Sequence, residues 1–230
     1  MNIIFEWTNT SQIQIDVLPV SVDQIKERIF FLKVEDLRSN TSVNSSLESL
    51  IKLSTKFFED RTSYMIYPRT LSGTMPYEDK YCYYYQFDDY RLSIRNVKTI
   101  DSIKYYPEDW NQDSLVNKTE LDIATHYHII PQSRISNIVL RRKSNAEFPI
   151  VYQGLNTLEL NLTCGYDIVS SAFVGLPFDI KEFIIQHVAE MYINNLNGCD
   201  CAPSASLNEY LLQIISSYKM QYFHEEIFII

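Results

Sequence analysis

Apolar and polar residues first follow a helical spacing over residues 21–32. Ser21, at the start of this stretch, stands three residues before Gln24. A hydroxyl and an amide at this spacing form a capping box, which satisfies free N–H groups in the first turn of a helix. We therefore expect a helix over residues 21–32. Its apolar face comprises Val22, Ile25, Ile29 and Leu32.

A second stretch with helical spacing covers residues 45–61. Apolar side chains recur three and four positions apart, as on the buried face of an amphipathic helix. Ser45 and Glu48 have the spacing of another capping box, so we expect the helix to begin at Ser45. The buried face comprises Leu47, Leu50, Ile51, Ser54, Phe57 and Phe58.

The pattern changes from helical to strand-like between residues 63 and 164. This block is rich in Tyr, Ile, Val and Thr, which favour strands, and is interrupted by Pro, Asn and Asp. Leu158, Leu160 and Leu162 alternate with polar residues, which predicts a strand with one buried face. The expected strands cover residues 63–68, 81–87, 90–95, 97–106, 124–130, 135–140 and 157–164.

Helical spacing returns after Pro177. A proline followed by Asp179 and Glu182 is typical of the first turn of a helix, where acidic residues complement the helix dipole. We expect one helix over residues 178–196 and another over residues 207–218. The apolar face of the longer helix comprises Ile180, Phe183, Ile184, His187, Val188, Met191 and Tyr192.

The order of elements is two helices, a block of strands and two further helices. Strands grouped between helices indicate an α+β fold, here a helical bundle of two N-terminal and two C-terminal helices with an inserted antiparallel β region. We expect an N-terminal extended arm over residues 1–20. A main domain follows over residues 21–198, with the β insertion at about 63–164. Residues 199–230 form a C-terminal helix and an apolar tail.

The composition supports a substantial core and disfavours some partners. Of the 230 residues, 46% are hydrophobic, and the 17 Tyr and 12 Phe suit both strands and protein interfaces. The formal net charge is −9 without a stripe of Arg and Lys, which disfavours tight nucleic-acid binding. We expect no signal peptide and no membrane contact, because no apolar run approaches the roughly 20 residues of a membrane span.

Few residues are candidates for metal binding. His126 and His128 would share one face of the expected strand 124–130, which leaves a small metal-dependent or ligand-binding module as the alternative function. No Asp, Glu or Cys at a suitable spacing completes such a site. Cys199 and Cys201 lack a second pair at zinc-site spacing. We therefore expect no metal and no other cofactor.

Motifs of common enzyme classes are missing from the sequence. The five glycines form no phosphate-binding loop and no nucleophile elbow. Adjacent acidic residues, as in Asp88-Asp89 and Glu225-Glu226, would point to opposite faces of a strand and could not converge on one bond. His187 stands in an apolar helix stripe, where a core histidine is expected. We expect no catalytic residues and no enzymatic activity.

The sequence ends in an apolar stretch. Free chain ends are usually polar, so we expect the apolar residues here to contact a partner surface, in the same subunit or in another chain. These residues are Phe223, Ile227, Phe228, Ile229 and Ile230.

Six short phrases stand in a fixed order between residues 20 and 196. They are VSVDQIK at 20–26, FFEDRT at 57–62, VKTIDSIKYY at 97–106, TCGY at 163–166, LPFDIK at 176–181 and VAEMYIN at 188–194. In this order they resemble the head-to-tail connector (adaptor) family of tailed phages. The sequence departs from the family in lacking its usual glycine after the second helix, in its longer strand block and in the segment from Cys199 onward.

The resemblance implies a structural virion protein at the head-tail junction, made in the host cytoplasm. It implies a dodecameric ring beneath the portal protein, which extends the DNA channel and docks tail or collar proteins. Genomic DNA would pass through the lumen of the ring without sequence-specific binding. The formal net charge of −9 agrees with weak binding of the chain to DNA.

Overall fold

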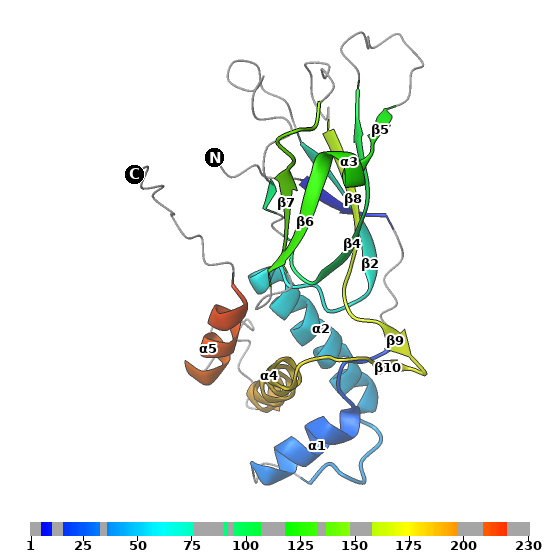
Figure 1. Ribbon diagram of the computed structural model, residues 1–230. Coiled ribbons are helices and arrows are strands. Elements are labelled where there is room, and N and C mark those ends of the chain that lie inside the picture. The colour runs from blue at the N-terminus through cyan, green and yellow to red at the C-terminus, as the bar shows by residue number, and fades with distance from the viewer. Residues whose placement is uncertain are drawn as a thin grey trace. The chain divides into compact units, whose positions relative to one another are not determined.

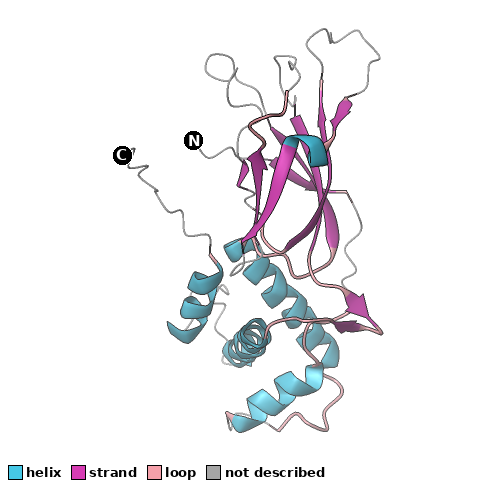
Figure 2. Cartoon of the chain, in the orientation of Figure 1, coloured by secondary structure: helices cyan, strands magenta, loops and turns pink. Residues whose placement is uncertain are grey.

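The computed structural model divides the chain into two compact units (Figure 1). The β unit comprises residues 1–17 and 65–175, and the helical unit comprises residues 18–64 and 176–230. All described strands belong to the β unit and the four longest described helices to the helical unit (Figure 2). The expected α+β class is therefore confirmed. The structure describes residues 6–10, 16–32, 36–75, 90–91, 94–106, 118–132, 137–147, 158–196 and 209–219.

A five-stranded antiparallel sheet forms the larger part of the β unit. Its strand order is β1-β2-β8-β4-β5, so β8 lies at the centre, between β2 and β4. Part of the expected N-terminal arm is paired in this sheet, as the edge strand β1. The strands are β1 (Glu6–Asn9), β2 (Arg69–Met75), β4 (Val97–Tyr105), β5 (Thr119–Leu121) and β8 (Leu158–Cys164).

Smaller elements complete the β unit. A three-stranded antiparallel sheet has the order β3-β7-β6, and β9 and β10 form a hairpin. A single helical turn, α3, leads into β6. Their bounds are β3 (Tyr90–Arg91), α3 (Ile123–His126), β6 (Tyr127–Gln132), β7 (Asn137–Arg142), β9 (Ile168–Val169) and β10 (Ala172–Phe173).

Both larger sheets contribute to one apolar core. On β8, Leu160, Leu162 and Cys164 are at most 1% exposed. The polar residues between them are only partly buried, which confirms the predicted strand with one buried face. The other buried residues of this core are Met65, Leu71, Ile94, Val97, Ile103, Tyr105, Leu121, Tyr127 and Leu140.

Strand β4 has two β-bulges, which explain the unusual spacing of its apolar residues. Its register against β8 shifts between Val97 and Thr99 and again between Ile100 and Ser102. Each shift inserts one extra residue and returns the next apolar side chain to the core. The apolar side chains on the core side are Val97, Ile100, Ile103 and Tyr105.

Four described helices belong to the helical unit, and α4 contacts the other three. They are α1 (Val22–Phe31), α2 (Asn44–Thr62), α4 (Phe178–Leu196) and α5 (Glu209–Tyr218). The predicted capping box opens α1: the Gln24 N–H donates to Ser21 Oγ at 3.2 Å, and the Ser21 N–H donates to Gln24 Oε1 at 2.8 Å. Helix α4 covers the predicted residues, 178–196.

The predicted apolar face of α4 is buried except at Tyr192, which is partly buried. His187, which lies within this face, is 2% exposed, and its Nδ1 lies 3.0 Å from Ser54 Oγ of α2. The ring also packs against Phe57 and Phe183, with centroid separations of 4.9 and 5.4 Å. The expected core histidine is confirmed.

The helix expected at 45–61 is confirmed to within one residue at each end, but its predicted capping box is wrong. Helix α2 begins at Asn44, with Val43 at the N-cap position and no capping side chain. Asn40 Oδ1 accepts hydrogen bonds from the N–H and the hydroxyl of Ser42, at 2.9 and 2.7 Å. This turn directs the chain into the helix before Ser45, so the second capping box does not form.

The expected strand at 63–68 is also wrong. Ser63 has a φ of 55° and ends α2 in the left-handed conformation. The strand in this region is β2, which begins at Arg69. Its polar residues alternate with Leu71 and Gly73, so hydrophobicity alone does not identify it.

Other strand predictions hold to different degrees. The strands at 97–106 and 157–164 are confirmed to within one residue. The strand expected at 135–140 corresponds to β7 at 137–142. Of the strand expected at 90–95, residues 90–91 form β3, residues 92–93 lie outside the described residues, and residues 94–95 do not continue the strand. The strand expected at 81–87 lies outside the described residues.

Candidate assembly surfaces

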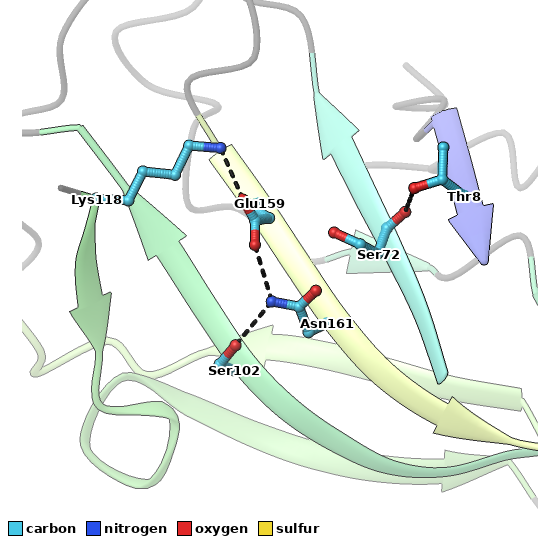
Figure 3. A network of polar contacts seen from close by, with 6 residues as sticks. All are labelled: Thr8, Ser72, Ser102, Lys118, Glu159 and Asn161. Atoms are coloured by element: carbon cyan, nitrogen blue, oxygen red, sulfur yellow. Dashed lines mark hydrogen bonds and ion pairs between the residues drawn. The ribbon is translucent and has the colours of Figure 1, made fainter. Parts of the chain in front are cut away.

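A connected row of polar side chains lies on part of the five-stranded sheet (Figure 3). Glu159 and Asn161 of this row alternate with the core residues Leu160 and Leu162, so they lie on the side away from the core. Lys118 Nζ, just before β5, donates to Glu159 Oε2 at 2.9 Å. Asn161 Nδ2 donates to Glu159 Oε1 and to Ser102 Oγ, both at 3.0 Å. The row thus joins the chain before β5, the central strand β8 and strand β4.

Glu159 is held in its charged form within this row. Partial burial by itself would raise the pKa of Glu159, but hydrogen bonds from Lys118 and Asn161 outweigh burial and hold that pKa below its usual value. Both carboxylate oxygens accept a hydrogen bond. The row therefore has the chemistry of a structural network, and Glu159 is not poised as a general base.

Asp101 fixes the second bulge of β4 to the neighbouring strand. Thr99 Oγ1 donates to Asp101 Oδ1 at 2.7 Å, and Thr163 Oγ1 on β8 donates to Asp101 Oδ2 at 2.8 Å.

At the β1 edge of the sheet, the Thr8 hydroxyl donates to the Ser72 carbonyl at 3.2 Å (Figure 3). Hydrogen bonds within the sheet thus occupy many of its polar side chains and fix its shape.

The β9–β10 hairpin carries apolar side chains on both faces. Its pairs are Ile168 with Phe173, Val169 with Ala172 and, through a backbone hydrogen bond of 2.9 Å, Asp167 with Val174. Paired residues share a face, and neighbours in a strand alternate. Val169, Ala172 and Val174 therefore share one face, which we name the hairpin patch. Val169 is 59% exposed and Val174 is 53% exposed.

The base of the hairpin is firmly attached to the rest of the β unit. The Phe173 ring packs edge-on against Tyr67 at a centroid separation of 5.5 Å, and Lys98 forms an ion pair with Asp167. Gly165, just before the hairpin, has a φ of +91°, and a Cβ there would lie 2.1 Å from the Tyr67 carbonyl oxygen. Only glycine fits this position.

A second exposed apolar cluster lies in the helical unit, at the end of α1. Phe30, Phe31 and Leu32 are 36%, 67% and 46% exposed, and we name them the α1 patch. The Arg38 guanidinium lies 3.7 Å from the centre of the Phe30 ring. Two hydrogen bonds of 2.9 Å to the Asp36 carboxylate hold the guanidinium in place and keep the pKa of Asp36 below its usual value.

The structure separates the two histidines of the expected metal site. His126 ends α3 and His128 lies in β6, because the Asp122 carboxylate caps α3 by accepting hydrogen bonds from the Ala124 N–H and the Thr125 hydroxyl. The expected strand at 124–130 is therefore wrong in its first half, and the shared strand face does not exist.

Both ring nitrogens of His126 lie within hydrogen-bond distance of a backbone carbonyl oxygen. Nδ1 lies 2.7 Å from the Asp122 carbonyl oxygen, and Nε2 lies 3.2 Å from the Glu147 carbonyl oxygen. In the part of the chain that the structure describes, no three His, Cys, Asp or Glu side chains are grouped to hold a metal ion. The histidine pair therefore gains no support as a metal site.

The predicted partner-contact residues lie outside the described residues. They are Phe223, Ile227, Phe228, Ile229 and Ile230. Cys199 and Cys201 lie outside them as well. The sequence did not predict the hairpin patch, although a signal was present: apolar residues on either side of Ser170-Ser171. Of the described helices, none combines the length and the apolar character needed to span a membrane.

The fold of this chain is found in gene transfer agent (GTA) particles. A chain in the neck of an empty GTA particle, computed with C6 symmetry, has a TM-score of 0.61 and 15% identity over 93% of this chain and 95% of that one. A chain in the neck of a native GTA particle, computed with C12 symmetry, has a TM-score of 0.59 and 14% identity over 93% and 94%. A chain of the native GTA virion has a TM-score of 0.60 and 15% identity over the same shares, 93% and 94%.

The likeness is one of fold and not of sequence. No protein-family model and no curated protein matches the chain. The alignments extend over nearly the full length of each chain, so they include both the helical unit and the β unit.

Proposed function

We propose that this chain is a structural subunit of the neck of a phage-like particle, located at the head-tail junction of the virion. The observation that supports this proposal is the alignment of 93% of the chain with neck chains of GTA particles. An isolated common motif would align over a small part of the chain. Here the alignment includes both the helical unit and the β unit.

The neck subunit is proposed to act as part of a ring made of copies of this chain. The neck structures with the same fold were computed with C6 and C12 symmetry, which a ring of identical subunits satisfies. Twelve copies agree with both symmetries, and a dodecamer is also what the connector resemblance implies. Aromatic residues are abundant, as at many protein interfaces.

The ring is proposed to sit beneath the portal protein, extend the DNA channel and dock tail or collar proteins. The net charge of −9 supports a passage to which DNA adheres weakly. The polar row on the five-stranded sheet supports a structural function, since its carboxylate is already occupied by two donors. We propose no catalytic activity for the chain.

The apolar C-terminal residues are proposed to contact the portal protein or an adjacent subunit. Phe223, Ile227, Phe228, Ile229 and Ile230 would add apolar area to such a contact. An extended segment of this kind can pair with an exposed sheet edge of a partner.

Electron cryo-microscopy of the complete particle tests the proposed function. The particle should carry this chain with a small tag fused to residue 1, and a particle with the tag on a capsid protein serves as the control. We expect a ring of added density at the head-tail junction in the first particle only. Absence of the chain from mature particles, or its presence only outside the neck, would contradict the proposal.

A further inference from the structure

We propose that the hairpin patch docks on the α1 patch of a second copy of this chain and so forms the contact between neighbours in the ring. This inference rests on the proposed ring function and deepens it by naming the two surfaces that meet. The hairpin patch is Val169, Ala172 and Val174, and the α1 patch is Phe30, Phe31 and Leu32.

The exposed face of the hairpin has the chemistry of a contact surface. A two-stranded hairpin is marginally stable in water by itself, and antiparallel strands that face water usually carry polar side chains there. Val169 and Val174 are more than half exposed although both are apolar and β-branched. Another surface placed over them would remove this apolar area from water.

The hairpin turn is held in a conformation that its residues disfavour. Ser170 and Ser171 have φ values of 50° and 60°, as in a type I′ turn, which usually contains Asn and Gly. Side chains with a Cβ rarely adopt these angles and do so where the surrounding structure fixes the backbone. The Lys98–Asp167 ion pair and the packing of Phe173 on Tyr67 fix the base of this hairpin. A preorganised projection loses little conformational entropy when it docks.

The symmetry of a ring explains why the partner is a different surface. In a closed ring of more than two copies, neighbours meet head to tail, so each copy needs two different contact surfaces. Among the described residues, the α1 patch is the only run of three consecutive exposed large apolar residues. It is also ordered, since Arg38 stacks on Phe30 and is held by Asp36.

The charges beside the two patches allow them to meet. Asp167 beside the hairpin patch is paired with Lys98, and Arg38 beside the α1 patch is paired with Asp36. Each charge is thus compensated within its own copy. Docking would bury apolar area without leaving an unpaired charge, which is the costly event in a protein interface.

The first test compares polar substitutions in the full-length chain, measured in necks isolated from particles. The double variant Val169→Ser and Val174→Ser should keep the melting temperature of the purified subunit, since both side chains are exposed. Its incorporation into the neck should fall at least about tenfold, because each ring contact loses two apolar side chains. The matched control is Ile129→Ser, at a β-branched residue of the same unit that is 48% exposed. Its incorporation should equal that of the wild type.

The second test identifies the surface that receives the hairpin. A chain with both Phe31→Cys and Val174→Cys, treated in assembled necks with a short bis-maleimide, should give a ladder of covalent multimers. Each single variant should give only the products of the wild type. Normal incorporation of the double serine variant, equal loss with Ile129→Ser or absence of the ladder would overturn the inference. A wild-type chain missing from the neck would instead refute the proposed function.

Discussion

The hydroxyl of Tyr218 lies 2.9 Å from both carboxylate oxygens of Asp179. Asp179 stands in the first turn of α4 and also accepts a hydrogen bond of 2.9 Å from the Ile180 N–H. Tyr218 is the last residue of α5, and its ring packs edge-on against Phe58 and Tyr64, at 5.4 and 4.9 Å. This pair therefore joins the end of α5 to the start of α4 and to the aromatic core of the helical unit.

Replacing Tyr218 by Phe should lower the free energy of unfolding by about 1 kcal/mol, because the ring packing stays while a hydrogen bond to a charged group is lost. Urea denaturation followed by circular dichroism measures the change. Tyr210→Phe is the matched control, since Tyr210 lies on the same helix and is 45% exposed. An equal loss of stability in both variants would show that the Tyr218–Asp179 hydrogen bond does not stabilise the helical unit.

The same pair predicts a dependence on alkaline pH. Burial, and then the hydrogen bond and the charge of Asp179, raise the pKa of Tyr218 above its usual value. The folded state thus favours the protonated phenol. The stabilisation is complete below pH of about 10, the pKa of an unfolded tyrosine, and is lost as the pH rises through the folded-state pKa. The difference in stability between wild type and Tyr218→Phe should therefore shrink above that pH.

Gly165 and Gly175, the two described glycines with positive φ, should differ in their response to alanine. Gly175→Ala should cost only about 1–2 kcal/mol of stability, the cost of the left-handed conformation, because among the described residues no atom beyond its two chain neighbours lies within 4 Å of the added Cβ. Gly165→Ala should cost more than about 4 kcal/mol or prevent folding of the β unit, because its Cβ would overlap the Tyr67 carbonyl. Thermal unfolding of both variants measures the difference. Similar melting temperatures would show that the backbone around Gly165 can move.

The polar row on the five-stranded sheet predicts a dependence on acidic pH. Glu159→Gln should lower the free energy of unfolding by at most about 1 kcal/mol at neutral pH, since Lys118 and Glu159 are partly exposed. The pKa of Glu159 is lowered in the folded state. The charged Glu159 carboxylate therefore adds to the free energy of unfolding above the unfolded pKa of about 4.3. This contribution is lost as the pH falls through the folded-state pKa.

Denaturation at several pH values tests this expectation. The difference between wild type and Glu159→Gln should vanish in acid. Glu120→Gln is the control, because Glu120 is exposed on β5 of the same sheet, which is separated from β8 by β4. A constant difference at all pH values would mean that the charge of Glu159 does not stabilise the sheet.

Local signals explain why the helices were predicted well. The Ser21 capping box and the apolar stripe of α4 depend on residues three and four positions apart, so a local pattern indicates them, although the same spacing at Ser45 forms no capping box. Strand β2 was missed because its identity depends on pairing with β8, where Leu71 meets Leu162. Asn161 and Ser102 are bonded across 59 positions in the sequence. No local pattern reveals such a contact.

The hairpin patch was missed for a related reason. Strands β9 and β10 have only two residues each, too few to show a period. The turn residues Ser170 and Ser171 are not those of a typical two-residue hairpin. The apolar face of Val169 and Val174 becomes visible only when the register of the two strands is known. The phrase at 97–106, which carries part of the family resemblance, was more informative than the strand period. The spacing of its apolar residues reflects the two bulges of β4.

The proposed contact of the C-terminal residues gives the last prediction. Deleting residues 226–230 should leave the unfolding free energy of the isolated chain unchanged if these residues contact a partner. Binding of the chain to purified portal protein, measured by co-sedimentation, should fall at least about tenfold, since one large apolar side chain contributes roughly 1.5–3 kcal/mol when buried. A variant of full length with Ser at 227–230 separates apolar character from length and should bind as weakly as the deletion. Portal binding and neck incorporation equal to wild type in both variants would show that these residues do not serve as a contact, and a large loss of stability would place them instead in the core of their own subunit.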